Sequence, residues 1–328
     1  MVATRGGHEG FVIDRGFQVF NTSYPQVRRR LALRALRLRP FTPGVLVHTD
    51  DGPLRLSDPT RGPRRLGDLR PGRLAGSRDL AALGVLSARD MLVPARAVKH
   101  GDDRTTRTAL AAGGFSEEFV ERFFRPFLSG VFLEDELETS SRVFHLVWRS
   151  MLRGTLCLPT EGIGAVPRLL ADALPAGAVH LDTPVARLTD DGVLLGTGGE
   201  LAARAVVVAT GPGQAAALLP GLEMPEYRTV TTYYHTAPRS PLAEPVLVTD
   251  VRRRFLNTCV TNAWQPLTVR TVPDALPAMP PPQPLSRTTR VGPRRYVCGD
   301  HRATGSVQGA LASGARAARE VARDLAAR

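Results

Sequence analysis

The clearest hydrophobic pattern lies near the end of the chain, in the segment YVCGDHRATGSVQGALASG at 296–314. Its first three residues are apolar and predict a strand at 295–298 that runs into Gly299-Asp300. The Ala-rich periodic stretch at 307–325 predicts a helix. A strand end, a glycine beside an acid, and a helix start that faces the same space are the parts of a dinucleotide site. The pattern therefore indicates half of such a site.

The rest of the pattern predicts further strands and helices. Strands are expected at 11–14, on both sides of Asp50-Asp51-Gly52 within 44–56, at 204–209, and over much of 227–269. Helices are expected at 23–39, 140–153 and 163–174. We expect the strand at 204–209 to pack beside the one at 295–298. Residues 273–284 (PDALPAMPPPQP) are too rich in proline for either element and predict an extended connector.

A stripe of phenylalanines, Phe119, Phe123 and Phe127, repeats at helical spacing within a predicted helical zone. Such a stripe can line a pocket for a hydrophobic substrate, but packing in a core is its commoner use. We therefore predict core positions for these three rings.

A second glycine pattern, Gly211-Pro212-Gly213-Gln214-Ala215-Ala216, follows an apolar strand and fits the dinucleotide fingerprint G-x-G-x-x-A. That fingerprint needs a full helix and an acid at the end of the next strand. Here Pro220-Gly221 ends the helix after about two turns, and no carboxylate ends the next strand. The pattern is a weak indication of a Rossmann opening.

Composition narrows the class of protein. The 328 residues are 43% hydrophobic, and no apolar run reaches the ~18–20 residues of a membrane span. No signal peptide is evident, so we expect a cytoplasmic protein without a transmembrane segment.

The net charge of +12 comes almost wholly from arginine, since Lys99 is the only lysine. The densest run, which includes Arg28, Arg29 and Arg30, predicts a solvated helix face rather than a nucleic-acid surface. The scattered cysteines and histidines predict no metal site.

Five segments occur in an order that resembles one known family. They are GFVIDRGFQVFNTSYP near the start, LPTEGIGAVPRLLADAL and VHLDTPVARL in the middle, AVVVATGP after them, and YVCGDHRATGSVQGALASG at the end. Together they resemble the flavin-dependent amine oxidase superfamily, which includes protoporphyrinogen oxidase and phytoene desaturase-like enzymes. The resemblance covers nearly the whole chain.

This resemblance implies an α/β fold with a discontinuous, Rossmann-like FAD-binding domain, here incomplete, and an α+β substrate domain. The implied segments are 1–58 (FAD domain and entry to the substrate domain), 59–157 (a mainly helical substrate or cap region), 158–222 (FAD domain), 223–285 (a shortened β-rich substrate domain) and 286–328 (the last FAD-domain strand and helix).

The resemblance also implies which residues meet the cofactor FAD. Gly299 and Asp300 would lie by the ribityl chain and phosphates, and the helix start at Ser306, Val307 and Gln308 would face the N1/C2 side of the flavin. Val185 would meet the adenine through its backbone, and Thr210-Gly211 would form a close turn beside the nucleotide. Asp14 and Gly16 belong to the matching Asp-Arg-Gly segment. No residue is assigned as a general acid or base.

Two departures from the family pattern affect these expectations. The ~30-residue βαβ unit with the Gly-rich turn would precede residues 1–16 and does not occur in this sequence. We therefore expect this chain alone to bind FAD weakly or not at all. Near Thr261 to Trp264 the family would insert more strands and a helix, so the substrate sheet is expected to be shortened.

Three functions follow from these observations. The leading one is an FAD-dependent oxidoreductase that takes a hydride from a C–H bond of a small hydrophobic, polyene-like or amine substrate. The second is a truncated, non-catalytic remnant that keeps the fold without holding FAD and acts as a binding protein. The third is an arginine-rich protein that binds anions or nucleic acid.

Overall fold

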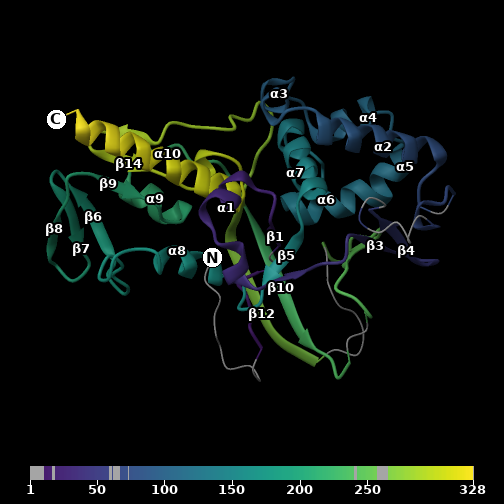
Figure 1. Cartoon of the computed structure of the whole chain (residues 1–328), viewed down its shortest axis with the longest axis horizontal. Helices are drawn as coiled ribbons and strands as arrows, with labels where there is room; N and C mark the ends of the chain where they lie inside the picture. Colours follow the sequence, from purple (N-terminus) through teal and green to yellow (C-terminus); the bar gives the residue numbers. More distant parts are fainter. Residues whose placement is uncertain are drawn as a thin grey trace.

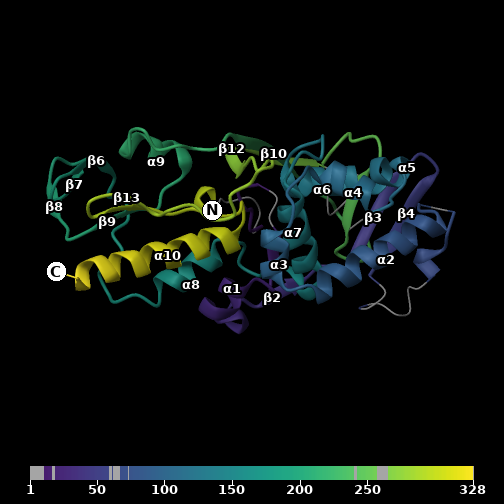
Figure 2. The same ribbon diagram turned by 90° about the horizontal axis from the view of Figure 1, so that it is seen from above.

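Two lobes lie at opposite ends of the molecule, with a two-stranded ribbon between them (Figure 1). The computed structural model describes residues 11–16, 19–58, 61, 67–72, 74–239, 242–256 and 265–327. The lobe that contains the C-terminal helix is called the C-terminal lobe here, and the other is called the helical lobe. Figure 2 shows the same division from above.

The C-terminal lobe is built on a small sheet with the order β13-β14-β9. β14 (Arg295–Val297) pairs parallel with β9 (Val206–Val208) and antiparallel with β13 (Arg290–Gly292). α10 (Val307–Ala326) follows β14 and runs along this lobe (Figure 1). The predicted strand, helix and strand pairing are therefore confirmed. α9 (Pro212–Leu218) has the expected two turns, and its Ala215 packs on Val208 and Val297.

A second sheet completes this lobe. Its strands are β6 (Val185–Thr189), β7 (Gly192–Leu195) and β8 (Glu200–Ala202), all antiparallel. The guanidinium of Arg295 donates to the Thr189 carbonyl at 3.2 Å, which ties the end of β6 to the start of β14. α8 (Ala165–Ala171) is shorter than the predicted helix at 163–174.

In the segment that joins the lobes, the single helix predicted at 23–39 is wrong. α1 (Pro25–Arg30) ends early, a 3₁₀ turn covers Leu33–Leu36, and Leu38–Pro40 forms β2. β2 and β1 (Phe20–Asn21) pair with opposite sides of β5 (Leu156–Pro159). This long-range pairing outweighs local helix propensity, which is a weak preference that tertiary contacts override. The predicted strand at 11–14 is also wrong, since only Ile13 forms a β-bridge there.

The helical lobe buries the predicted phenylalanine stripe. Its helices are α2 (Ser77–Leu92), α3 (Ala95–His100), α4 (Thr106–Ala112), α5 (Glu117–Phe119), α6 (Arg125–Phe132) and α7 (Ser141–Arg153). A π-helical turn over Val120–Phe124 joins α5 to α6. The ring of Phe123 stacks on those of Phe119 and Phe127, with centroids 5.2 and 5.8 Å apart. The core prediction is confirmed, and Phe127 in addition touches the cavity described below.

A three-stranded sheet closes the helical lobe. β3 (Gly44–Thr49) and β4 (Gly52–Ser57) form the predicted hairpin around Asp50-Asp51-Gly52, and β11 (Leu247–Asp250) adds parallel to β3. Val45, Val47 and Leu56 of this sheet belong to the same apolar core as the phenylalanines.

The central ribbon consists of β10 (Tyr227–Thr236) and β12 (Gln265–Pro277), paired antiparallel. The first five residues of the predicted connector at 273–284 belong to β12, which corrects that prediction. Pro273 and Pro277 are tolerated because a two-stranded ribbon leaves one edge of each strand without ladder partners. Residues 257–264 of the predicted β-rich stretch, and with them the predicted shortening near Thr261 to Trp264, lie outside the described residues.

Candidate cofactor and substrate cavity

A cavity of about 2230 Å³ lies along the central ribbon and reaches both lobes. On the C-terminal side it is lined by the start of α10 and by Asp14, Gly211 and Asp300. On the helical side its wall consists of apolar side chains from α6 and α7, among them Phe132, Val143 and Leu146. The cavity therefore joins the residues predicted to meet a nucleotide to an apolar chamber.

The carboxyl ends of β9 and β14 lie side by side, because Val208 and Val297 are partners in the parallel ladder. Thr210-Gly211 follows one strand and Gly299-Asp300 follows the other. Ligands of open α/β sheets bind at this edge. Gly299 has φ of 159°, and an added Cβ would lie 2.5 Å from Cε1 of the buried His301. Only glycine fits this turn without displacing that ring.

Asp300 carries a carboxyl group that faces the cavity. Its Oδ1 accepts a hydrogen bond from the His301 backbone N–H at 2.8 Å and one from the Tyr227 hydroxyl at 3.3 Å. Burial raises the pKa of Asp300, and these two hydrogen bonds act against that rise. Burial and the neighbouring Asp300 carboxylate raise the pKa of Tyr227. The Tyr227 hydroxyl therefore stays protonated at all ordinary pH values, and its hydrogen bond orients the Asp300 carboxyl group.

The Asp14–Gly16 segment is held from two directions. The backbone N–H of Ile163 donates to both carboxylate oxygens of Asp14, at 3.0 and 3.1 Å. The Tyr234 hydroxyl donates to the Asp14 carbonyl at 2.8 Å and to the Gly16 carbonyl at 3.0 Å. Burial raises the pKa of Asp14, and it raises the pKa of Tyr234 to about 12. The central ribbon therefore fixes this segment at the cavity wall.

The start of α10 opens on the cavity. Ser306 caps the helix, with its hydroxyl accepting from the Gly309 N–H at 3.1 Å. The Gln308 side chain accepts from the Gln26 N–H at 2.9 Å and so joins α10 to α1. The first N–H groups of a helix lack intrahelical acceptors and carry partial positive charge. This end of the cavity is therefore suited to an electron-rich group.

Seven of the ten residues predicted to meet the cofactor line this cavity: Asp14, Gly16, Gly211, Asp300, Ser306, Val307 and Gln308. Thr210 and Gly299 are adjacent to lining residues without lining the cavity themselves. Val185 begins β6 in the separate sheet of the C-terminal lobe and is 38% exposed. The binding role of all ten stays a prediction.

Sequence reasoning missed the two tyrosines. Tyr227 and Tyr234 lie on one strand and reach two chain segments that are 73 and 218–220 residues away. Nothing in the local pattern of β10 distinguishes them from Tyr233, whose side chain is 66% exposed. The one feature of the sequence that could have drawn attention to them is the presence of tyrosines near both ends of the same predicted strand.

The described residues fit FAD in three respects. The parallel strand ends and the start of α10 converge on one cavity. The hydrogen bonds from the Tyr227 hydroxyl and the His301 N–H both end on Oδ1 of Asp300, so Oδ2 is placed to accept from a ribityl or ribose hydroxyl. An added Cβ at Gly309 would lie 1.8 Å from the Thr304 carbonyl oxygen, so only glycine allows the tight turn that sets the start of α10 against the cavity.

The described residues hold neither a metal-binding cluster nor a membrane-spanning helix. No group of three or more histidine, cysteine or acidic side chains in the described ranges could hold a metal ion. Likewise, no helix in the part of the chain covered by the structure has the length and apolar character to cross a membrane.

Solved structures share this fold. Cyclohexylamine oxidase from Brevibacterium oxydans IH-35A is 16% identical, with 98% of this chain and 90% of that chain covered and a TM-score of 0.63. A protein assigned as a protoporphyrinogen oxidase from Exiguobacterium sp. 255-15 is 16% identical, with 99% and 90% covered and a TM-score of 0.61. A double mutant of putrescine oxidase is 12% identical, with 97% and 89% covered and a TM-score of 0.56. At these identities the likeness establishes the fold alone.

The family model for flavin containing amine oxidoreductases matches residues 2–239 and 247–322. A search of curated proteins found no match. The matched residues include both lobes, the central ribbon and every residue predicted to meet the cofactor. The fold is that of the FAD-dependent amine oxidases, and the chain belongs to the flavin containing amine oxidoreductase family as an FAD-dependent oxidoreductase.

Proposed function

We propose that this protein oxidises a small hydrophobic or amine substrate, with N5 of bound FAD accepting a hydride from a C–H bond beside nitrogen or from an allylic C–H bond. The observation that supports this most is the single cavity that joins the start of α10 and Asp300 to an apolar chamber. An acceptor and a substrate must meet in one space that water does not fill.

The ten predicted residues would contact different parts of the cofactor. Asp300 accepts hydroxyl groups of the ribityl chain, with Tyr227 and the His301 N–H fixing its carboxylate. The turns at Thr210-Gly211 and Gly299 let the backbone approach the nucleotide. Val185 would meet the adenine through its backbone. Asp14 and Gly16 would support the cofactor from their own position in the cavity wall.

The start of α10 supplies electrostatic stabilisation. Its partial positive charge at Ser306, Val307 and Gln308 favours negative charge that develops nearby when electrons arrive. The walls from α6 and α7 exclude water and strengthen that effect through their low polarity. These residues bind and orient, and no described side chain is assigned a proton transfer.

The test is FAD binding by the purified chain. The sequence predicts weak FAD binding, so the purified chain is titrated with FAD to saturation, where the absorbance of bound flavin should appear and anaerobic substrate should bleach it. Asp300→Asn should weaken FAD binding at least about tenfold, because a hydrogen bond to a charged group contributes ~1.5–3 kcal/mol. The matched control is Asp51→Asn, in the exposed turn between β3 and β4, which should bind FAD unchanged.

A colourless protein at saturating FAD contradicts this function and favours the remnant that keeps the fold without holding FAD. Equal FAD affinity of the Asp300→Asn variant and the control rejects the role given to Asp300. The predicted cytoplasmic location stays a prediction.

A further inference from the structure

The outer side of α2 presents two large apolar side chains to solvent. Val85 is 70% exposed and Leu92 is 81% exposed. They are seven residues apart, so they lie on one face of the helix, about 10 Å from each other along its axis. Met91, beside Leu92, is exposed as well. Single exposed apolar residues are common, but a group of them on one helix indicates a contact surface.

The exposed charges of α2 and α3 are all basic. α2 contributes Arg89, and α3 contributes Arg96 and Lys99. No carboxyl group is exposed over 77–101, a stretch that the structure describes in full, because the two acids of α2 are only 5% and 1% exposed. The first exposed acid beyond this stretch is Asp102, after the end of α3. This surface therefore attracts anionic partners.

Hydrogen bonds from α7 fix α2 and α3 from behind. One terminal nitrogen of Arg149 donates to the carbonyls of Met91 at 3.0 Å and Val93 at 2.7 Å, where α2 ends. The Arg142 guanidinium donates to the Lys99 carbonyl of α3 at 3.1 Å. In Figure 2, α2 and α3 lie along one edge of the molecule. One side of these two helices is thus held against α7, and the other faces solvent.

The α2–α3 corner also adjoins the cavity. Met91, Ala95 and Lys99 belong to the cavity lining, so the cavity wall continues to this part of the surface. The neighbouring α7 contributes apolar lining residues, among them Val143 and Leu146. An apolar partner bound at this corner would therefore lie close to the apolar chamber.

Nucleic acid is one anionic partner that a basic surface can attract. Its phosphates would contact the cations and leave Val85 and Leu92 in water. The stretch 77–101 also contains no phenylalanine, tyrosine or tryptophan on which a base could stack. A membrane surface with anionic lipid uses both the charges and the apolar side chains, and it fits this surface better.

The α2–α3 face is defined by six residues: Val85, Arg89, Met91, Leu92, Arg96 and Lys99. We propose that the α2–α3 face docks on a membrane surface that contains anionic lipid. The apolar side chains enter the boundary between headgroups and acyl chains, and the three cations bind the negatively charged headgroups. Docking does not depend on the function proposed above, because it requires neither FAD nor catalysis. It brings the apolar chamber close to the phase in which hydrophobic molecules dissolve.

The experiment measures binding of the full chain to sedimented vesicles, with FAD and without it. Vesicles of phosphatidylserine mixed with phosphatidylcholine are compared with vesicles of phosphatidylcholine alone. The mixed vesicles are expected to bind at least about tenfold more tightly, with an affinity that falls as salt rises. Val85→Ser with Leu92→Ser should lower the affinity for mixed vesicles at least about tenfold, and Arg89→Glu with Arg96→Glu should do the same.

The matched controls change the same residue types in the C-terminal lobe. Val179→Ser with Leu181→Ser removes two exposed apolar side chains, and Arg187→Glu with Arg204→Glu reverses two exposed charges. Both controls should keep the vesicle affinity of the unchanged protein. All four double variants change exposed side chains, so their thermal unfolding should match that of the unchanged protein.

Three outcomes would overturn the proposal. The first is unchanged vesicle binding by Val85→Ser with Leu92→Ser. The second is an equal loss of affinity in the charge variant and its control, which would show attraction by the net charge of the whole chain. The third is binding to duplex DNA that is tighter than binding to mixed vesicles at equal phosphate concentration. Vesicle binding by protein that holds no FAD contradicts the proposed function alone and supports docking.

Discussion

At the scale of single residues, the turn after β14 combines three groups that constrain one another. Gly299 leaves room for the His301 ring, and the backbone N–H of His301 orients the Asp300 carboxylate. The His301 side chain is only 4% exposed, and its Nε2 has no hydrogen-bond partner among the described atoms. Burial first, and then the charges of Arg302 and Arg287, lower the pKa of His301 to about 4. The imidazole is therefore neutral in the folded protein.

This lowered pKa predicts a pH dependence of stability. Between about pH 6.5 and 4 the unfolded chain binds a proton at His301 that the folded chain does not, so stability falls as the pH is lowered through this range. The loss should reach about 2–3 kcal/mol near pH 4. Urea unfolding of His301→Gln and of the unchanged protein measures it. The difference between the two should change with pH between 7 and 4.5, whereas a constant difference contradicts the prediction.

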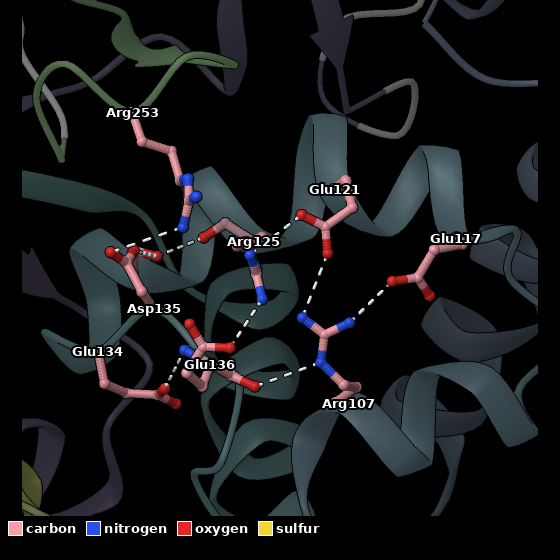
Figure 3. Close-up of polar contacts among 9 residues, drawn as sticks. Arg107, Glu117, Glu121, Arg125, Glu134, Asp135, Glu136 and Arg253 are labelled. Atoms are coloured by element: carbon pink, nitrogen blue, oxygen red, sulfur yellow. Dashed lines mark hydrogen bonds and ion pairs between the residues drawn. The ribbon is translucent and has the colours of Figure 1, made fainter.

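At the scale of elements, an ion-pair network joins the start of α4, α5, α6 and the loop after α6 (Figure 3). Glu121 is shared: its Oε1 lies 3.2 Å from Nη2 of Arg107, and its Oε2 lies 3.2 Å from Nη1 of Arg125. Arg107 also pairs with Glu117 at 2.8 Å, and Arg125 with Glu136 at 2.9 Å. Single surface pairs contribute little, but a shared carboxylate between two half-buried arginines contributes more.

Glu121→Gln should therefore lower the free energy of unfolding by about 1 kcal/mol. The control Glu118→Gln removes one exposed pair, with Arg122, and should change stability by less than about 0.5 kcal/mol. Thermal unfolding at low and high salt compares the two variants. The difference should shrink at high salt, and equal effects of the two substitutions would count against the network.

At the scale of the whole molecule, the central ribbon connects the apolar chamber to the segments that are predicted to meet the cofactor. Tyr227 reaches Asp300 and Tyr234 reaches the Asp14–Gly16 segment, so one strand supports both sides of the cavity. Movement of the ribbon would displace both segments together.

Tyr234→Phe should lower the free energy of unfolding by about 1–2 kcal/mol, because two backbone carbonyls lose their donor. Amide hydrogen exchange at 11–16 should become faster in this variant. Tyr233→Phe is the matched control, with an exposed ring one residue away, and should leave both measurements unchanged. Unchanged exchange at 11–16 in Tyr234→Phe would refute the connection.

The sequence by itself determined the elements whose pattern is local. The strand and helix around Gly299-Asp300, the hairpin at Asp50-Asp51-Gly52 and the burial of Phe119, Phe123 and Phe127 follow from periodicity and turn chemistry, which act over a few residues. The order of five segments also identified the family, and with it the cofactor. Gly211, Asp300 and the start of α10 line one cavity because the pattern located β9, β14 and α10 correctly.

Only the tertiary structure decided what depends on distant partners. Leu38–Pro40 left the predicted helix because β5, more than a hundred residues later, offers it a ladder, and residues 273–277 became strand because β10 pairs with them. Tyr227 and Tyr234 gain their roles from contacts across 73 and 218–220 residues. Local sequence cannot encode these features, because hydrogen bonding and charge depend on distance in space and not on separation along the chain.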